Sequence, residues 1–169
     1  NAGNEAFVLH ADAYGTSNKN LRIPGSAWTS TVQNQRGDAG PSGQLPNSQG
    51  DSEPYGLGGP VMLGGKGYAG VAYSQFKTNY GTVAEPDVTI DLKRDTWNFA
   101  GELRDTIPGL RALRVKYAYT DYQHTEFEGS EAGTVFKSDG YNLRVEALHR
   151  PVGPFTGAVG LEVVDFKFS

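Results

Sequence analysis

LRALRVKYAYTDYQHTEFEGSEAGTVFKSDGYNLRVEALHRPVGPFTGAVGLEV, residues 110–163, alternates apolar and polar side chains through three successive segments. In the first segment Leu113, Val115, Tyr117 and Tyr119 alternate with charged or small residues. The same alternation returns over residues 141–147 and again over residues 158–163. Because successive side chains of a β-strand point to opposite faces, this period predicts three strands, each with one apolar and one polar face.

Strands of this kind occur both in soluble β-sandwiches and in membrane barrels. The three segments have roughly the 9 to 11 residues that a tilted strand needs to cross a bilayer. A membrane barrel turns its apolar face to lipid, places aromatic residues near the edges of that face, and lines its lumen with polar residues. The mixture of aromatic, aliphatic and charged positions in residues 110–163 favours the barrel.

The composition favours β-structure and excludes several functions. The chain has 169 residues, with 23 Gly, 9 Tyr, 8 Phe and no Cys. It contains no run of roughly 18 to 20 apolar residues, so strands would have to carry any passage through a membrane. The net charge of −4 and the absence of a basic stripe argue against nucleic acid as a partner. Without Cys, the chain has neither disulfides nor a thiolate metal site.

Alternation and turn residues along the whole chain predict seven strands. They are expected over residues 4–14, 55–63, 68–76, 88–103, 110–125, 135–149 and 155–169. The connections are then long (15–54), short (64–67), medium (77–87), short (104–109), medium (126–134) and short (151–154). Alternating short and longer connections are typical of an outer-membrane barrel, whereas a Greek-key sandwich has no reason to alternate.

The strand over residues 88–103 changes its pattern part-way. Trp97, Phe99 and Leu103 share one parity, while Val88, Ile90 and Leu92 share the other. We expect either a bulge between the two sets or a strand whose upper part stands clear of the bilayer.

Several blocks resemble the early barrel region of TonB-dependent outer-membrane receptors, in particular the subgroup related to zinc and siderophore uptake. The blocks are HADAYGTSNKNLRIPG (10–25), QLPNSQ (44–49), GGKGYAGVAYSQFKTNYG (64–81), IDLKRDTWNFAGEL (90–103), YTDYQHTEFEGSEAGTVFKSDGYNLRVEALHRPVG (119–153) and the closing GAVGLEVVDFKFS.

The resemblance implies an antiparallel up-and-down transmembrane β-barrel of about 22 strands with a plug. Residues 1–169 would be a partial barrel domain of about seven strands, without the plug, its TonB-binding segment and the other strands. The implied function is uptake of a scarce metal ion or a metal chelate such as a siderophore across the bacterial outer membrane. The implied partners are outer-membrane lipid, the TonB system and the metal or siderophore. Zinc-type members often carry a His cluster where this chain reads GTVAEPD, so the substrate stays open.

The candidate site residues fall into two groups. His124, Glu126 and Glu128 stand at i, i+2 and i+4, so on a continuous strand they share one face, and an imidazole with two carboxylates can hold a divalent ion. A solvated acidic loop is the alternative interpretation of these three residues. The second group is a set of charges whose parity places them on the polar, lumen-facing side: Glu102, Arg114, Lys116, Arg144, Glu146 and Glu162.

No catalytic motif is present, so we expect no enzymatic activity and no cofactor. GGKG at 64–67 has the wrong spacing for a phosphate-binding loop and precedes a strand rather than a helix. His10, Asp12 and His149 are interpreted as lumen or interface residues. The alternative to a transport protein is a soluble or secreted β-sheet module that binds a partner through the long segment 15–54.

Overall fold

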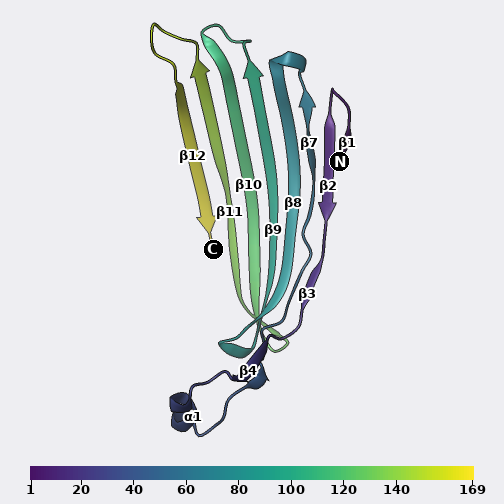
Figure 1. The fold of residues 1–169 in the computed structure, drawn as a ribbon, viewed down its shortest axis with the longest axis vertical. Helices are drawn as coiled ribbons and strands as arrows, with labels where there is room; N and C mark the ends of the chain where they lie inside the picture. The colour runs from purple at the N-terminus through teal and green to yellow at the C-terminus, as the bar shows by residue number, and fades with distance from the viewer.

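The computed structural model covers residues 1–169 and places most of them in one antiparallel sheet (Figure 1). The strands of its main path follow the chain order β1-β2-β7-β8-β9-β10-β11-β12. Their bounds are β1 Ala2–Gly3, β2 Val8–Ala13, β7 Tyr55–Met62, β8 Gly67–Thr82, β9 Glu85–Arg104, β10 Leu110–Glu128, β11 Glu131–His149 and β12 Ala158–Phe168. The predicted all-β, antiparallel class is confirmed, and each of the seven predicted strands has a counterpart.

Two predicted loops are wrong, because the strands run through them. Strand β8 continues to Thr82 and β9 begins at Glu85, so the expected loop 77–87 shrinks to Val83 and Ala84. Likewise the expected connection 126–134 shrinks to the turn between Glu128 and Glu131. From β8 onward the connections still alternate in length, but in the opposite order: the two expected to be medium are the shortest, and 105–109 and 150–157, expected to be short, are longer.

Segment 15–54, expected to be a long loop without regular structure, contains five short elements. They are β3 Thr16–Asn18, β4 Arg22–Ser26, α1 Ser30–Arg36, β5 Ser42–Gln44 and β6 Gly50–Ser52. Strand β6 pairs with β8, and β3 pairs with β6, so these two extend the main sheet. Residues 22–44, which we call the α1 lobe, lie beyond the end of the sheet that carries the β8–β9 and β10–β11 turns (Figure 1).

The α1 lobe folds on polar contacts of its own. The Thr29 side chain accepts the Val32 amide at 3.4 Å and caps the helix. The Gln33 side-chain Nε2 donates to the Ser26 hydroxyl at 2.8 Å, and the Arg36 guanidinium lies 4.8 Å from the ring centre of Trp28. These contacts give structure to a stretch whose sequence shows no alternation.

The Asn47 side chain connects segment 15–54 to the sheet by hydrogen bonds. Its side chain is 7% exposed, and Nδ2 lies within hydrogen-bond distance of the carbonyls of Thr82, Glu85 and Val88, at 3.0, 2.9 and 2.6 Å. A Cβ on Gly81 would overlap the Asn47 amide oxygen, so this approach requires glycine. Asn47 follows the α1 lobe in the chain, so its hydrogen bonds join the residues after the lobe to the β8–β9 turn.

The sheet is a single layer and has almost no core. Only 6 of 169 residues are buried, and Ala112 is the sole buried apolar residue. Strands β1 and β12 each have one neighbour, so the sheet stays open. Many large apolar side chains therefore face outward, among them Phe99 at 46% and Leu161 at 65% exposed. No helix of the structure is long and apolar enough to span a membrane.

Strand pairing puts the odd-numbered residues of the long strands on one face along most of their length. Paired residues are odd with odd and even with even, as in Tyr73 with Trp97 and Trp97 with Tyr119. The exceptions lie at the strand ends, where the register shifts: Thr82 with Glu85, Leu110 with His149, Phe127 with Ala132 and Glu128 with Glu131. Directly opposite residues of antiparallel strands point to the same side. We call the two sides the odd face and the even face. Pairing between β9 and β10 is uninterrupted from Val88 to Arg104, which excludes the bulge predicted there.

Candidate functional site: the two faces of the long strands

The odd face is apolar along the half of the strands that ends at the β9–β10 and β11–β12 connections. On β10 this half lies between the charged residues Arg111 and Asp121, and on β9 it lies between Asp95 and Asp105, the residue that follows the strand. Nine residues separate the two charges in each case. We call this region the apolar belt. Its odd-face members on the four last strands are Trp97, Phe99, Leu103, Leu113, Val115, Tyr117, Tyr119, Tyr141, Leu143, Val145, Ala147, Val159, Leu161 and Val163.

One edge of the apolar belt is aromatic on four neighbouring strands. Tyr73, Trp97, Tyr119 and Tyr141 lie opposite one another in register. The ring centres of Tyr73 and Trp97 are 4.8 Å apart, and Trp97 is 45% exposed. We call these four residues the aromatic row. Tyr and Trp prefer a boundary where an apolar ring body and a polar tip meet different surroundings.

The even face opposite the apolar belt carries a ladder of charges. The Arg114 Nε donates to the Glu102 carboxylate at 2.6 Å, and Arg104 bonds the other oxygen of Glu102. On the next strands the Arg144 Nη2 donates to Glu146 at 2.6 Å and its Nη1 lies 3.9 Å from Glu162. The six charges predicted from parity are thus on one face. Five of them form ion pairs, whereas Lys116, opposite Arg144, forms none.

Beyond the aromatic row the two faces exchange their character. The odd face becomes charged, with Asp95, Asp121 and Asp139 in one register row and Lys77, Lys93 and Lys137 near the next. The even face becomes aromatic: His124 stacks on Phe136 with ring centres 4.5 Å apart. This exchange explains the parity change seen in the sequence of β9, because the strand itself continues without interruption.

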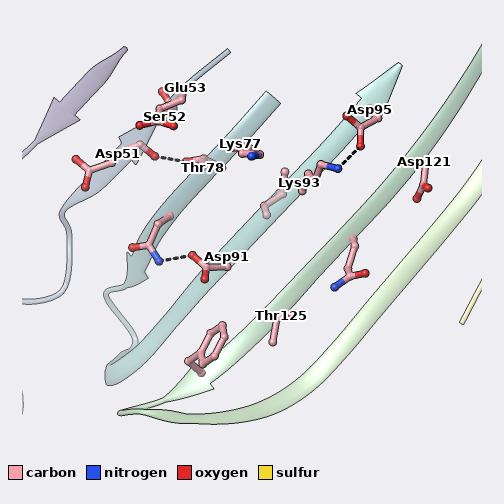
Figure 2. A pocket seen from close by; sticks show the side chains of 14 residues that line it. Asp51, Ser52, Glu53, Lys77, Thr78, Asp91, Lys93, Asp95, Asp121 and Thr125 are labelled. Atoms are coloured by element: carbon pink, nitrogen blue, oxygen red, sulfur yellow. Dashed lines mark hydrogen bonds and ion pairs between the residues drawn. The ribbon is translucent and has the colours of Figure 1, made fainter. Parts of the chain in front are cut away.

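A polar hollow of about 620 Å³ lies on the charged part of the odd face (Figure 2). Asp95, at its edge, binds the Lys93 Nζ at 2.7 Å and accepts the Tyr73 hydroxyl at 2.5 Å and the Gln75 amide at 2.6 Å. Burial opposes ionisation of Asp95, but these three hydrogen bonds outweigh it and lower its pKa from 3.8 to about 2. The Asp91 carboxylate accepts a hydrogen bond from the Asn79 side-chain amide. Several polar side chains of the hollow therefore already have hydrogen-bond partners within it.

The structure contains no group of three or more His, Asp or Glu side chains that could hold a metal ion. His124, Glu126 and Glu128 do lie on one strand at even positions, as predicted. The His124 Nδ1 bonds the Tyr122 hydroxyl at 2.8 Å, and its ring is stacked on Phe136. Metal binding by these three residues stays a prediction of the sequence, without a geometric argument for it.

The other histidines have local partners. The His10 Nε2 lies 2.9 Å from Asp12, and its Nδ1 bonds the Asn1 side chain. The His149 Nδ1 lies 2.7 Å from the Arg150 carbonyl. Their interpretation as lumen or interface residues stays a prediction.

Sequence reasoning missed two features. One is the band of Asp and Lys on the odd face. Its signal is the shared odd parity of Asp95, Asp121 and Asp139 within three predicted strands, but only the register between the strands brings them level. The other is Asn47, which lies within the QLPNSQ block but has partners 35 or more residues away. The chain matches no protein-family model.

Proposed function

We propose that this sheet is a section of the wall of a membrane-spanning β-barrel, with the odd face of the apolar belt against lipid and the even face toward the lumen. The single observation that carries the proposal is the apolar belt with its charged limits. Ten residue steps from Arg111 to Asp121 measure about 33 Å along the strand. At a tilt of about 40° this is about 25 Å along the membrane normal, the height of the apolar band of outer-membrane barrels.

The energetic argument concerns the lack of a core. A soluble sheet hides one apolar face against another layer, whereas here both faces are uncovered and the apolar one is the belt. Contiguous exposed apolar surface of this kind marks a protein or membrane contact. Lipid is the partner that fits, because the limit formed by Asp95, Asp121 and Asp139 runs level across three strands, with the aromatic row beside it.

The broader proposal is that the wall belongs to a TonB-dependent outer-membrane receptor that takes up a scarce metal ion or a metal chelate. Its support is the sequence resemblance together with the charged even face, which suits a lumen. The long excursion between β2 and β7 would lie outside the cell, because outer-membrane barrels have their long loops on that side. A plug and further strands would come from outside residues 1–169.

The test of the lipid contact uses the two tryptophans. In a Trp28→Phe variant the remaining Trp97 should be quenched when the chain is mixed with vesicles of brominated phosphatidylcholine. In the matched Trp97→Phe variant, Trp28 in the α1 lobe should stay unquenched, because the lobe lies beyond the charged limit of the belt. A chain that is folded and monodisperse in plain buffer, with Trp97 unquenched by vesicles, would contradict the proposal.

The uptake role needs its own test. Deleting the gene in its host should slow growth when a chelator limits iron or zinc, and growth should return when the gene is restored. Equal growth of the deletion strain under starvation for each metal would remove the uptake proposal while leaving the lipid contact intact.

A further inference from the structure

A second hollow, of about 520 Å³, lies on the odd face across β2, β7, β8 and β9, which are neighbours in the sheet (Figure 1). Gly59 of β7 forms part of its lining, and Val71 of β8 lies directly opposite. Leu57 and Val61 stand two residues away from Gly59 on the same strand and face. Every lining residue is aliphatic, aromatic, glycine or proline. We call this space the Gly59 hollow.

The chain cannot fill this space with a side chain at position 59. A Cβ on Gly59 would overlap the Val8 carbonyl oxygen, because the backbone of β2 passes close to β7 there. Gly101 also lies on the odd face of the belt, but a Cβ on Gly101 would lie 3.4 Å from the nearest neighbouring atom, the Tyr68 carbonyl oxygen, which is an ordinary contact. Close approach of two backbones therefore requires glycine at position 59, and the hollow is a fixed consequence of strand packing.

The lining of the hollow selects a hydrocarbon. No charged or amide side chain lines it, and the Tyr73 hydroxyl already donates to Asp95 at 2.5 Å. A polar ligand group placed there would lose its hydrogen bonds to water without replacement. Leu57 and Val61 are four residue steps apart, so the hollow extends about 13 Å along the strand. Its volume lies within the range of about 300 to 1,000 Å³ that is typical of small-molecule sites.

The shape of the hollow argues against a protein partner. The outermost strands that line it, β2 and β9, are three strand spacings or about 14 Å apart. Phe7 on β2 and Trp97 on β9 take up part of this width, so a helix of about 10 to 12 Å diameter is too wide to enter. A second copy in a two-fold contact would bring the same concave surface against itself, and two concave surfaces do not fill each other. A single flexible chain of methylene groups fits the space.

One end of the hollow lies at the aromatic row. Leu57 pairs with Tyr73 of that row. At the other end Val61 pairs with Ala69, which pairs with Gly101 in the middle of the belt. The hollow therefore occupies the half of the belt next to the aromatic row. Aromatic rings of this kind mark the level of lipid headgroups, so this is where acyl chains begin.

We propose that the Gly59 hollow binds one acyl chain of a membrane lipid, which enters from the aromatic row, and holds it more tightly than the rest of the belt does. This rests on the proposed contact of the odd face with lipid. Lipid tails are as apolar as the belt, so transfer between them contributes no preference. The preference comes from dispersion, because a chain in the hollow contacts protein on several sides and a chain on the flat belt on one. The headgroup is not recognised, because no charged residue lines the hollow.

The test is a fluorescence titration of the full 169-residue chain folded in digitonin micelles. The rigid rings of digitonin cannot enter the hollow as a flexible chain does. Phospholipid brominated in the upper half of its acyl chains is added at rising mole fraction, and the Trp28→Phe chain reports the quenching of Trp97. The reference chain, Trp28→Phe/Trp97→Phe/Tyr141→Trp, carries its tryptophan level with Trp97 but two strands away.

We expect the quenching of Trp97 to saturate at one lipid per chain. At low mole fraction it should be about fivefold stronger than in the reference chain, the effect of about ten additional carbon–carbon contacts. Phosphatidylcholine and phosphatidylglycerol with the same brominated chains should quench equally, because the hollow contacts only the chain.

A matched pair of variants isolates the hollow. Val71 is 44% exposed and lies opposite Gly59, so the larger ring of Val71→Phe fills the space and should reduce the quenching of Trp97 to the reference level. Val115→Phe makes the same change at another odd-face valine of the belt that lies opposite a glycine, Gly101, and should leave the quenching unchanged. Far-UV circular dichroism checks that each variant folds, and sedimentation measures the number of chains per micelle.

Quenching that rises linearly and equally for Trp97 and for the reference tryptophan would remove the acyl-chain site and leave the lipid contact intact. Unchanged quenching in Val71→Phe, or quenching that depends on the headgroup, would also overturn the inference. A dimer that Val71→Phe dissociates would identify a second copy, and not a lipid, as the occupant of the hollow. If lipid quenches neither tryptophan in the folded chain, the lipid contact itself fails and the acyl-chain site fails with it.

Discussion

Substituting Val115 with lysine tests directly whether the apolar belt faces lipid. Val115 lies on the odd face of β10, opposite Gly101 and Val145. It is four residues from Arg111 and six from Asp121, which at a tilt of about 40° places it about 10 and 15 Å from the two limits of the belt. A lysine so near the bilayer centre on a lipid-facing position costs about 2 to 4 kcal/mol.

The assay is urea denaturation of the chain refolded in phospholipid vesicles, with Trp28→Phe in every variant so that the fluorescence reports Trp97 alone. The matched variant is Ala118→Lys, three positions along the same strand but on the even face, next to Asn98 and Asn142. Its lysine would enter a polar lumen, so we expect a change within about 0.5 kcal/mol.

If the sheet were soluble, the two substitutions would change the free energy of unfolding differently. Val115 is already 37% exposed, so in water a lysine there would change the free energy of unfolding by about 0.5 kcal/mol or less. The reasoning is refuted if Val115→Lys costs no more than that in vesicles, or if both variants cost the same.

Three further predictions concern the sheet and its attachments. Asn47→Ala leaves the three carbonyls at the β8–β9 turn without their donor, so we expect the free energy of unfolding to fall by about 1 to 3 kcal/mol. Segment 15–54 should also be cleaved faster by a protease. An unchanged cleavage rate would mean that other contacts hold this segment on the sheet. Gly59→Ala places a Cβ on the Val8 carbonyl oxygen, so amide hydrogen exchange should become faster in β2 and stay slow in β10. Equal exchange rates in the native and variant chains would contradict the pairing of β2 with β7. Because the pKa of Asp95 is lower in the fold than its ordinary 3.8, this carboxylate stabilises the fold above about pH 4 and the gain disappears as the pH falls toward 2. A pKa lowered from 3.8 to about 2 corresponds to roughly 2 kcal/mol. Asp95→Asn should therefore flatten this part of the pH dependence of the free energy of unfolding, measured by urea denaturation, and a pH curve parallel to that of the native chain would argue against it.

Alternation in the sequence was sufficient for the strands and for the faces of the belt. Leu113, Val115, Tyr117 and Tyr119 needed only the two-residue period of a strand to be placed on one side. The same period put Glu102, Arg114 and Glu146 on the other side, and the register confirms it. These features are predictable because the face to which a side chain of a strand points depends only on whether its residue number is odd or even.

The length of the strands was not predictable in the same way. Beyond Asp121 the apolar residues of β10 move to the opposite parity, so a search for one apolar face ends this strand at residue 125, although it continues to Glu128. Backbone hydrogen bonding to the neighbouring strand decides where a strand ends. Thr78 and Tyr80 lie in the expected loop 77–87, yet they pair with Leu92 and Ile90 of β9. Backbone pairing depends on a second strand, which the local pattern of one strand does not describe.

By itself, the sequence determined the all-β class, the existence of seven strands and the division of their residues between two faces, because each follows from local periodicity and turn chemistry. Only the tertiary structure decided which residues stand level with one another. The aromatic row and the ladder of charges on the even face each join residues on neighbouring strands that are 12 or more positions apart in the sequence. Their alignment depends on the register between strands, which is set by two-residue turns and continuous hydrogen bonding across the whole sheet.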